Sequence, residues 1–248
     1  MKDIFSSLLK QTFEKLDKID FGQILRDFVP QQPSQRNMRE VGAEWSCKDL
    51  NQQLCQLSQM GLRVTELPKS IDLSGLASVM ARLNEKSKDG KEYGRIGYTR
   101  MHDGRIEMSE TFSGNHRSVK MEVTYLPFSS RTPTVMMHTH PYINGRAAPS
   151  YHFSKQDFVS FLQVKPIQIS LVLAPHLTLL ALKTAATPEH SSILESRIDS
   201  LLERASRDFT TSSDRRIMRF TKRACNDLNI GLYRVKHSED GVIARRVV

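Results

Sequence analysis

The sequence is poor in cysteine and has no long apolar stretch. Its three cysteines are scattered and form no Cys-x-x-Cys pair, which disfavours a disulfide framework and a thiolate zinc site and favours a reducing compartment. No apolar run reaches the roughly 18 residues that a membrane-spanning helix needs. The first five residues include an acidic side chain and begin a helical pattern, unlike a signal peptide. We therefore expect a cytoplasmic protein that does not associate with membranes.

Acidic residues are outnumbered by basic ones. The chain has 27 Asp and Glu against 36 Lys and Arg, a formal net charge of +9. Such an excess favours an acidic partner, and a nucleic-acid-associated protein is one class to consider. The basic side chains of residues 213–228 are the natural place for such contacts. However, no aromatic cluster is interleaved with them and no nucleic-acid motif is present. The pattern is more typical of a solvated basic helix face.

Internal repeats and low-complexity tracts are also lacking. Apolar residues recur at helical spacing over residues 4–28. This predicts one or two amphipathic helices that either pack on the main domain or dock a protein partner. Residues 30–44 are polar and contain two prolines, as linkers do. We predict an N-terminal helical region and linker at residues 1–70, and a main domain at residues 71–248 that ends in two helices and a hairpin.

The main domain mixes strand and helix patterns, so we expect an α/β fold of the α+β type. Apolar or alternating runs predict strands at residues 62–67, 92–101, 105–112, 119–125, 134–140, 167–173, 177–182, 231–236 and 241–247. Helical spacing predicts helices at residues 46–61, 74–88, 154–164, 191–206 and 213–228. Asp72 or Ser74 is expected to cap the second of these helices. In the fourth, the expected inward residues are Ile193, Ile198, Leu201 and Leu202.

The stretch with the clearest chemistry is His138-Thr139-His140. The apolar residues before it predict a buried strand, and side chains two positions apart leave the same face of a strand, so both histidines point at one spot. Asp157 lies in the first turn of the next predicted helix. Two imidazoles and one carboxylate, with a fourth position left open, are the ligand set of a catalytic zinc site. We predict that His138, His140 and Asp157 bind Zn²⁺.

Each part of this pattern has a simpler explanation when it is taken alone. Ser154-x-x-Asp157 fits a helix capping box, with Phe153 packing on Phe158 as a hydrophobic staple. Isolated histidine pairs are found at exposed strand edges. The order of these motifs favours a metal site. The strand ends in His-Thr-His-Pro, a loop follows, and the next helix opens with Phe-Ser-x-x-Asp. This order brings the three candidate ligands to one edge of the sheet.

This combination resembles the JAMM motif of the JAB/MPN zinc metallopeptidases, in which an upstream Glu precedes His-x-His-Pro and Ser-x-x-Asp. The resemblance covers about residues 72–185, and the order of helices and strands agrees as well. The stretch Glu92-Tyr93-Gly94, followed by His-Thr-His and Phe-Ser-x-x-Asp, is similar to a bacterial JAB-like branch of the family. The resemblance implies a JAB/MPN-like mixed β-sheet flanked by helices.

The resemblance also implies roles for individual residues. His138, His140 and Asp157 correspond to the zinc ligands, and Ser154 to the residue that positions the substrate carbonyl or stabilises its oxyanion. Glu92 corresponds to the general base that takes a proton from the attacking water. Its rivals for this role are Glu107, foremost, then Glu110 and Glu122. Thirteen residues separate His140 from Ser154, more than is usual in the family. His152 in this loop is expected to be a loop residue or a substrate contact, with a metal ligand as the alternative.

The function implied by the resemblance is that of a zinc metallopeptidase of the deubiquitinase type. Such a protein hydrolyses peptide or isopeptide bonds at the C-terminus of ubiquitin or a ubiquitin-like protein, so conjugates of these proteins are the expected partners. Two alternatives belong to other classes. One is a catalytically inactive MPN-like interaction scaffold, and the other is the basic nucleic-acid-associated protein considered above.

Overall fold

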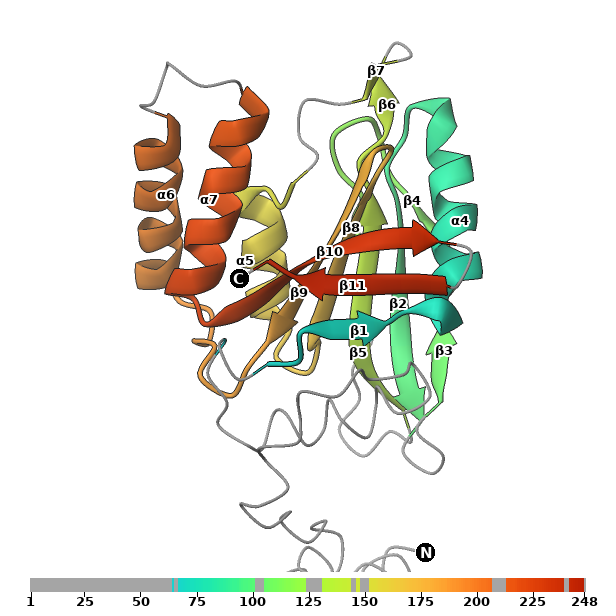
Figure 1. Ribbon diagram of the computed structural model, residues 1–248, viewed down its shortest axis with the longest axis horizontal. Helices are drawn as coiled ribbons and strands as arrows, with labels where there is room; N and C mark the ends of the chain where they lie inside the picture. Colours follow the sequence, from blue (N-terminus) through green and yellow to red (C-terminus); the bar gives the residue numbers. More distant parts are fainter. Residues whose placement is uncertain are drawn as a thin grey trace, which may run out of the picture. The chain divides into compact units, whose positions relative to one another are not determined.

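The computed structural model describes residues 64, 67–100, 105–123, 131–143, 146–147, 152–206, 213–238 and 241–247. In this part of the chain, a curled mixed β-sheet is flanked by four α-helices (Figure 1). The strands are β1 (Ser70–Asp72), β2 (Tyr93–Arg100), β3 (Ile106–Met108), β4 (Phe112–Ser113), β5 (Arg131–Thr139), β6 (Tyr142–Ile143), β7 (Arg146–Ala147), β8 (Ile169–Ala174), β9 (Leu177–Lys183), β10 (Ile230–Ser238) and β11 (Gly241–Arg246). The helices are α4 (Ala77–Lys86), α5 (Lys155–Gln163), α6 (Ser192–Ser206) and α7 (Ser213–Asp227).

Nine of the strands form the main sheet, in the order β1-β11-β10-β9-β8-β5-β2-β3, with β4 also paired to β2. Strands β6 and β7 form a separate two-stranded ladder. Among the described strands, only β5 and β8 pair in parallel. Parallel neighbours need a long crossover, and α5 provides it. The end of β5 and the start of α5 therefore lie at the same edge of the sheet.

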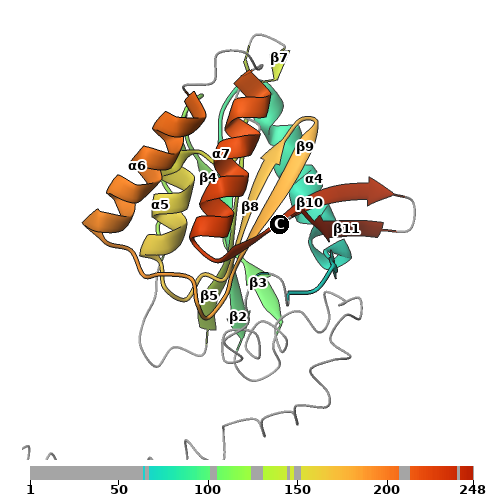
Figure 2. The same ribbon diagram turned by 60° about the vertical axis from the view of Figure 1, so that its left-hand side comes forward.

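Helices cover both faces of the sheet. Figure 1 shows α5, α6 and α7 grouped on one face and α4 on the other, and Figure 2 shows the same separation after a turn of 60°. The first group buries a core in which Phe158 of α5 and Phe220 of α7 meet edge to face, with ring centroids 5.9 Å apart. Sheet residues that face this core are Ile96, Met136, Val172, Leu179, Ala181, Ile230 and Leu232. This face also carries the candidate ligands of β5.

Most of the predicted elements of the main domain are confirmed. The hairpin of β2 and β3, the histidine strand β5, helix α5, the β8–β9 pair, helices α6 and α7 and the final hairpin all lie within a few residues of their predicted bounds. Helix α4 ends as expected: a 3₁₀ turn at Ser87–Asp89 follows it, and Gly90 closes this turn with a φ of 86° that favours glycine. The mixed α/β class is therefore correct.

Cys225 is buried, as expected of a small apolar side chain, and burial raises the pKa of its thiol. No helix in the described ranges has both the length and the apolar character that crossing a membrane requires.

Several predictions of local structure are wrong. The strand predicted at residues 119–125 is absent over residues 119–123, where the backbone pairs with no other strand. The side chains nevertheless alternate between half-buried and exposed, as predicted. Helix α4 starts at Ala77 after a 3₁₀ turn (Ser74–Leu76), and no side chain caps it. Asp72 belongs to strand β1, which pairs with β11 and was not predicted. The loop after His140 contains the short ladder of β6 and β7.

Other predictions fall on parts of the chain that the structure does not describe. These include the N-terminal helices at residues 4–28, the linker at 30–44, the helix at 46–61 and nearly all of the strand at 62–67. The boundary at residue 70 and the docking of a partner on the N-terminal helices therefore stay predictions.

Helix α6 offers a matched pair of isoleucines for a stability test. Ile193 was predicted to face the core but is 80% exposed, whereas Ile198 is fully buried. We expect Ile198→Ala to lower the free energy of unfolding by about 2–5 kcal/mol, because it removes buried apolar surface and leaves a cavity. Ile193→Ala should change it by less than about 0.5 kcal/mol. Urea unfolding of both variants checks this, and equal losses would contradict the orientation of α6.

Candidate metal centre

His138, in β5, and His140, one residue past its end, point at one spot, as the strand periodicity predicted. Their Nε2 atoms lie 3.1 Å apart, and the two residues are 4% and 5% exposed. His138 pairs with Val172 of β8, and the backbone N–H of His140 donates to the Leu173 carbonyl at 2.8 Å. Strand pairing on this side therefore continues past the last residue of β5 and fixes both imidazoles at the sheet edge.

Asp157 reaches the same spot from helix α5. Its Oδ1 lies 3.0 Å from Nε2 of His138, and its Oδ2 lies 3.6 Å from Nε2 of His140. The predicted capping box is present too: Ser154 Oγ accepts from the Asp157 N–H at 3.1 Å, and Asp157 Oδ2 accepts from the Ser154 N–H at 2.7 Å. Phe153 packs on Phe158 with ring centroids 5.4 Å apart, as a hydrophobic staple does. The capping box therefore holds the carboxylate in place beside the two imidazoles.

The spacing of the three groups fits a small divalent metal ion. A tetrahedral zinc ion with nitrogen and oxygen ligands at about 2.0–2.1 Å separates neighbouring ligand atoms by roughly 3.3 Å. The separations here are 3.1, 3.0 and 3.6 Å. In the described part of the chain, His138, His140 and Asp157 form the group of histidine, cysteine or acidic residues close enough together to hold an ion. The donor set and its geometry are compatible with zinc.

The imidazoles also set the ionisation of the aspartate. Burial raises the pKa of Asp157, but hydrogen bonds and electrostatic interactions with His138 and His140 outweigh burial and hold the pKa well below its usual range. The carboxylate is therefore ionised, as a metal ligand must be. The second nitrogen of His138, Nδ1, is buried, and no described residue forms a hydrogen bond with it.

Glu92 lies beside this cluster. Gly94 pairs with His138 across β2 and β5, so Glu92, two positions earlier, faces the same side of the sheet as both histidines. The side chain is 8% exposed. Burial is the main cause that raises its pKa above the usual value, and the negative charge of Asp157 adds to this effect. The two imidazoles act in the opposite direction. Glu92 is therefore close enough to the three candidate ligands to interact with them electrostatically.

An irregular segment, residues 114–119, clamps Glu92 on its other side. The Glu92 N–H donates to the Asn115 carbonyl at 2.7 Å, and the Glu92 carbonyl accepts from the Gly114 N–H at 2.8 Å. The Val119 N–H donates to the Glu92 carboxylate, which lowers its pKa. A Cβ at Gly114 would collide with the Ser118 carbonyl oxygen, so only glycine fits this turn. This clamp was not predicted, because the alternation over residues 119–125 indicated a strand. The Gly114-Asn115 pair was the available signal of a turn.

The rivals of Glu92 lie elsewhere. Glu107 forms ion pairs with Arg100 and Arg131, both at 3.1 Å, and Arg131 is at the opposite end of β5 from the histidines. Glu110 and Glu122 are exposed. His152 is buried but does not belong to the three-residue group. Of the predicted site residues, the structure brings together His138, His140, Asp157, Glu92 and Ser154.

Comparison of the chain with models of known protein families, with curated proteins and with solved structures finds no match. The resemblance to the JAB/MPN family therefore rests on the motif residues and their order.

Loss of one imidazole should abolish tight metal binding. We expect the protein to bind about one Zn²⁺ per chain. Loss of a group that merely orients a ligand lowers metal affinity by about 10–100-fold, so His138→Ala, which removes a ligand itself, should lower it by more than roughly 100-fold. Asp157→Asn keeps an oxygen for the Ser154 N–H but removes the charged ligand, and should also weaken binding. Elemental analysis after dialysis measures this. His176→Ala, in an exposed turn, is the control. Unchanged zinc in His138→Ala would refute the ligand assignment.

The clamp can be tested through Asn115, whose Oδ1 accepts from the N–H groups of Arg117 and Ser118 at 2.8 and 3.0 Å. Asn115→Ala removes this acceptor, and Asn115→Asp keeps it. At about 1 kcal/mol for such a bond, we expect Asn115→Ala to speed amide hydrogen exchange at Ser118 and Val119 by roughly fivefold. Exchange in Asn115→Asp should stay near the native rate. Equal rates in the two variants would show that the side chain does not organise the turn.

Proposed function

We propose that the protein is a zinc-dependent peptidase or isopeptidase of the JAMM type, with a JAB/MPN-like domain. The observation that carries the proposal is the buried cluster in which two imidazoles and a carboxylate are spaced for one ion, with a buried glutamate beside them. A structural site usually has a fourth protein ligand, whereas three ligands leave a position open for chemistry. The order of helices and strands around the cluster also agrees with the motif.

Zinc would be held by His138, His140 and Asp157, where it would polarise a scissile carbonyl and make a water molecule acidic enough to react at neutral pH. The protein itself supplies rigid ligands. The imidazoles are fixed by strand pairing, and the carboxylate is fixed by the capping box. Little reorganisation is then needed when the ion binds, which favours both affinity and a defined geometry.

Glu92 is the residue in place to move protons. Its carboxylate lies on the same face as the histidines, and the Val119 N–H holds it. In this position it accepts a proton from the attacking water and delivers one to the amine that leaves. Burial favours this exchange because it raises the pKa of Glu92, so the protonated carboxyl is a more accessible intermediate than it would be in water.

Ser154 contributes a hydroxyl at the rim of the cluster. Its oxygen already accepts from the Asp157 N–H, so its own proton is available for donation. A donor aimed at the oxygen of the substrate carbonyl stabilises the negative charge that develops there, which is worth about 3 kcal/mol for a single donor. We assign this role to Ser154.

The proposed substrates are conjugates or precursors of ubiquitin or a ubiquitin-like protein, cleaved after the modifier's C-terminal tail. This assignment comes from the resemblance to the JAMM motif. An extended tail can add to the edge of a sheet through backbone hydrogen bonds, a mode that needs little side-chain recognition. A panel of ubiquitin-like fusions is therefore the appropriate substrate set.

We expect the zinc-loaded protein to cleave at least one fusion of this panel, and a chelator to stop cleavage. Glu92→Gln should retain zinc but lower the turnover rate by about 10²–10⁴-fold, the usual contribution of a positioned acid–base group. Glu107→Gln is the matched control, since Glu107 is engaged by two arginines away from the cluster, and should leave turnover unchanged. Gel-based cleavage assays and elemental analysis give both readouts.

Two results would contradict the proposal. Equal losses in Glu92→Gln and Glu107→Gln would remove the special role of Glu92. Full zinc occupancy with no cleavage of any fusion would favour the inactive MPN-like scaffold.

A further inference from the structure

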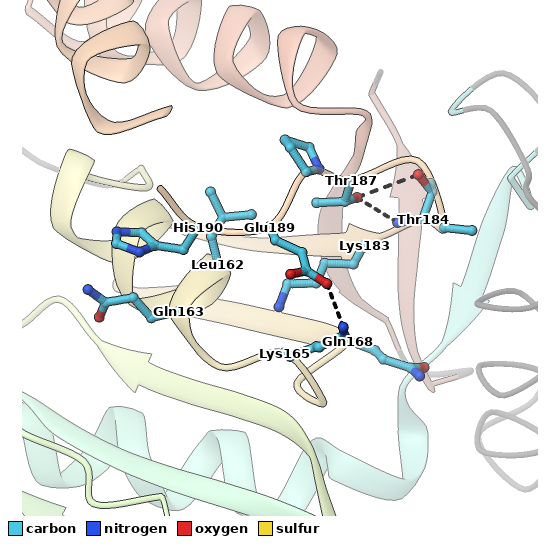
Figure 3. A pocket seen from close by; sticks show the side chains of 11 residues that line it. Leu162, Gln163, Lys165, Gln168, Lys183, Thr184, Thr187, Glu189 and His190 are labelled. Atoms are coloured by element: carbon cyan, nitrogen blue, oxygen red, sulfur yellow. Dashed lines mark hydrogen bonds and ion pairs between the residues drawn. The ribbon is translucent and has the colours of Figure 1, made fainter. Parts of the chain in front are cut away.

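A separate pocket lies at the opposite end of helix α5 from Asp157. Its volume is about 400 Å³, within the range of small-molecule sites. The end of α5, the end of β9 and the loop before α6 line it, with Leu162, Gln163, Lys165, Lys183, Thr187 and Glu189 among the lining residues (Figure 3). Helix α5 has nine residues and is therefore roughly 13 Å long. The pocket is thus distinct from the candidate metal centre.

Lys183, the last residue of β9, extends into this pocket (Figure 3). Its side chain is half-buried, and Nζ lies 4.6 Å from the ring centroid of Phe161. Nζ donates to the Val164 carbonyl at 2.9 Å. Among the described residues, no carboxylate lies within ion-pair distance of it, and the Glu189 carboxylate in the same pocket is paired with Lys165 at 2.5 Å instead. The Lys183 amine is therefore partly shielded from solvent in the pocket, and no described carboxylate neutralises its charge.

We propose that this pocket binds a small aldehyde or ketone and that Lys183 captures it as an imine. The amine lone pair attacks the carbonyl carbon and forms a C–N bond. The two hydrogens of the amine leave with the carbonyl oxygen as water, so the step needs no other reactant. A neutral amine can donate one hydrogen bond to the Val164 carbonyl and still carry the lone pair that this attack requires. Leu162, Pro188 and Ala185 give the bound molecule an apolar surface.

The two lysines of the pocket differ in protonation state: Lys183 loses its proton more readily than an ordinary lysine, and Lys165 less readily. Burial lowers the pKa of Lys183 to about 7, so about half of the amine is neutral at physiological pH. Lys165 is exposed, and its hydrogen bond and ion pair with Glu189 raise its pKa, which keeps it protonated. The other titratable groups at the pocket are Glu189 and His190, and His190 is paired with Glu195 at 2.5 Å.

The test uses the full chain, propionaldehyde as the probe and cyanoborohydride to reduce any imine to a stable amine. Peptide mass spectrometry then gives the extent of labelling at each lysine. At neutral pH we expect Lys183 to be labelled at least roughly tenfold faster than Lys165, since an ordinary lysine is almost entirely protonated there. The ratio should fall toward one as the buffer is made alkaline beyond the ordinary lysine pKa, because both amines then become neutral. Labelling of Lys183 no faster than that of Lys165 would overturn the proposal.

Two conservative variants separate the site from general surface reactivity. Lys183→Arg keeps a donor for the Val164 carbonyl and a cation over Phe161, and should abolish the fast labelling. Lys165→Arg should leave it unchanged, and loss of fast labelling in this variant would contradict the assignment to Lys183. If Lys183→Arg fails to fold, the site-resolved rates in the native chain decide alone. The experiment is unaffected by a zinc chelator, so its outcome is independent of the proposed hydrolase activity.

Discussion

The parallel pairing of β5 with β8 is the constraint on which the candidate metal centre depends. Every other ladder of the main sheet is antiparallel. An antiparallel neighbour could be joined to β5 by a tight hairpin, whereas a parallel one requires the chain to return across the sheet, and α5 makes this return. The helix must then begin at the edge of the sheet where β5 ends. That requirement brings Asp157, in the first turn, to His138 and His140 at the end of the strand.

Much of this arrangement could be predicted from the sequence, because the signals that specify it are local. Strand periodicity placed His138 and His140 on one face, and a capping pattern placed Asp157 in the first turn of α5. A capping box and a metal ligand are two explanations of Ser154-x-x-Asp157, and the position of the Asp157 carboxylate fits both. The same carboxylate accepts the Ser154 N–H and faces the imidazoles. A helix cap and a ligand-orienting contact are compatible roles for one side chain.

What could not be predicted depends on contacts between distant segments. The alternation over residues 119–123 gives the correct burial, but the segment makes no ladder and instead donates its Val119 N–H to Glu92. Ile193 fits a helical apolar stripe, yet the position of α6 against its neighbours leaves it in solvent and buries Leu194. Periodicity reports which residues share a face, but not which face meets a neighbour. The resemblance favoured Glu92 over Glu107 in the sequence, but the position of Glu92 beside the histidines follows from the register of β2 on β5.

The pairing of β1 with β11 has a consequence for how the domain completes its folding. Ser70 is opposite Arg245, 175 positions away in the chain (245 minus 70). Nearby, the Tyr233 hydroxyl donates to the Pro68 carbonyl and an Arg246 guanidinium N–H to the Val64 carbonyl. Contacts between such distant positions close large loops and form slowly. During synthesis β1 therefore stays unpaired until β11, near the end of the domain, has left the ribosome.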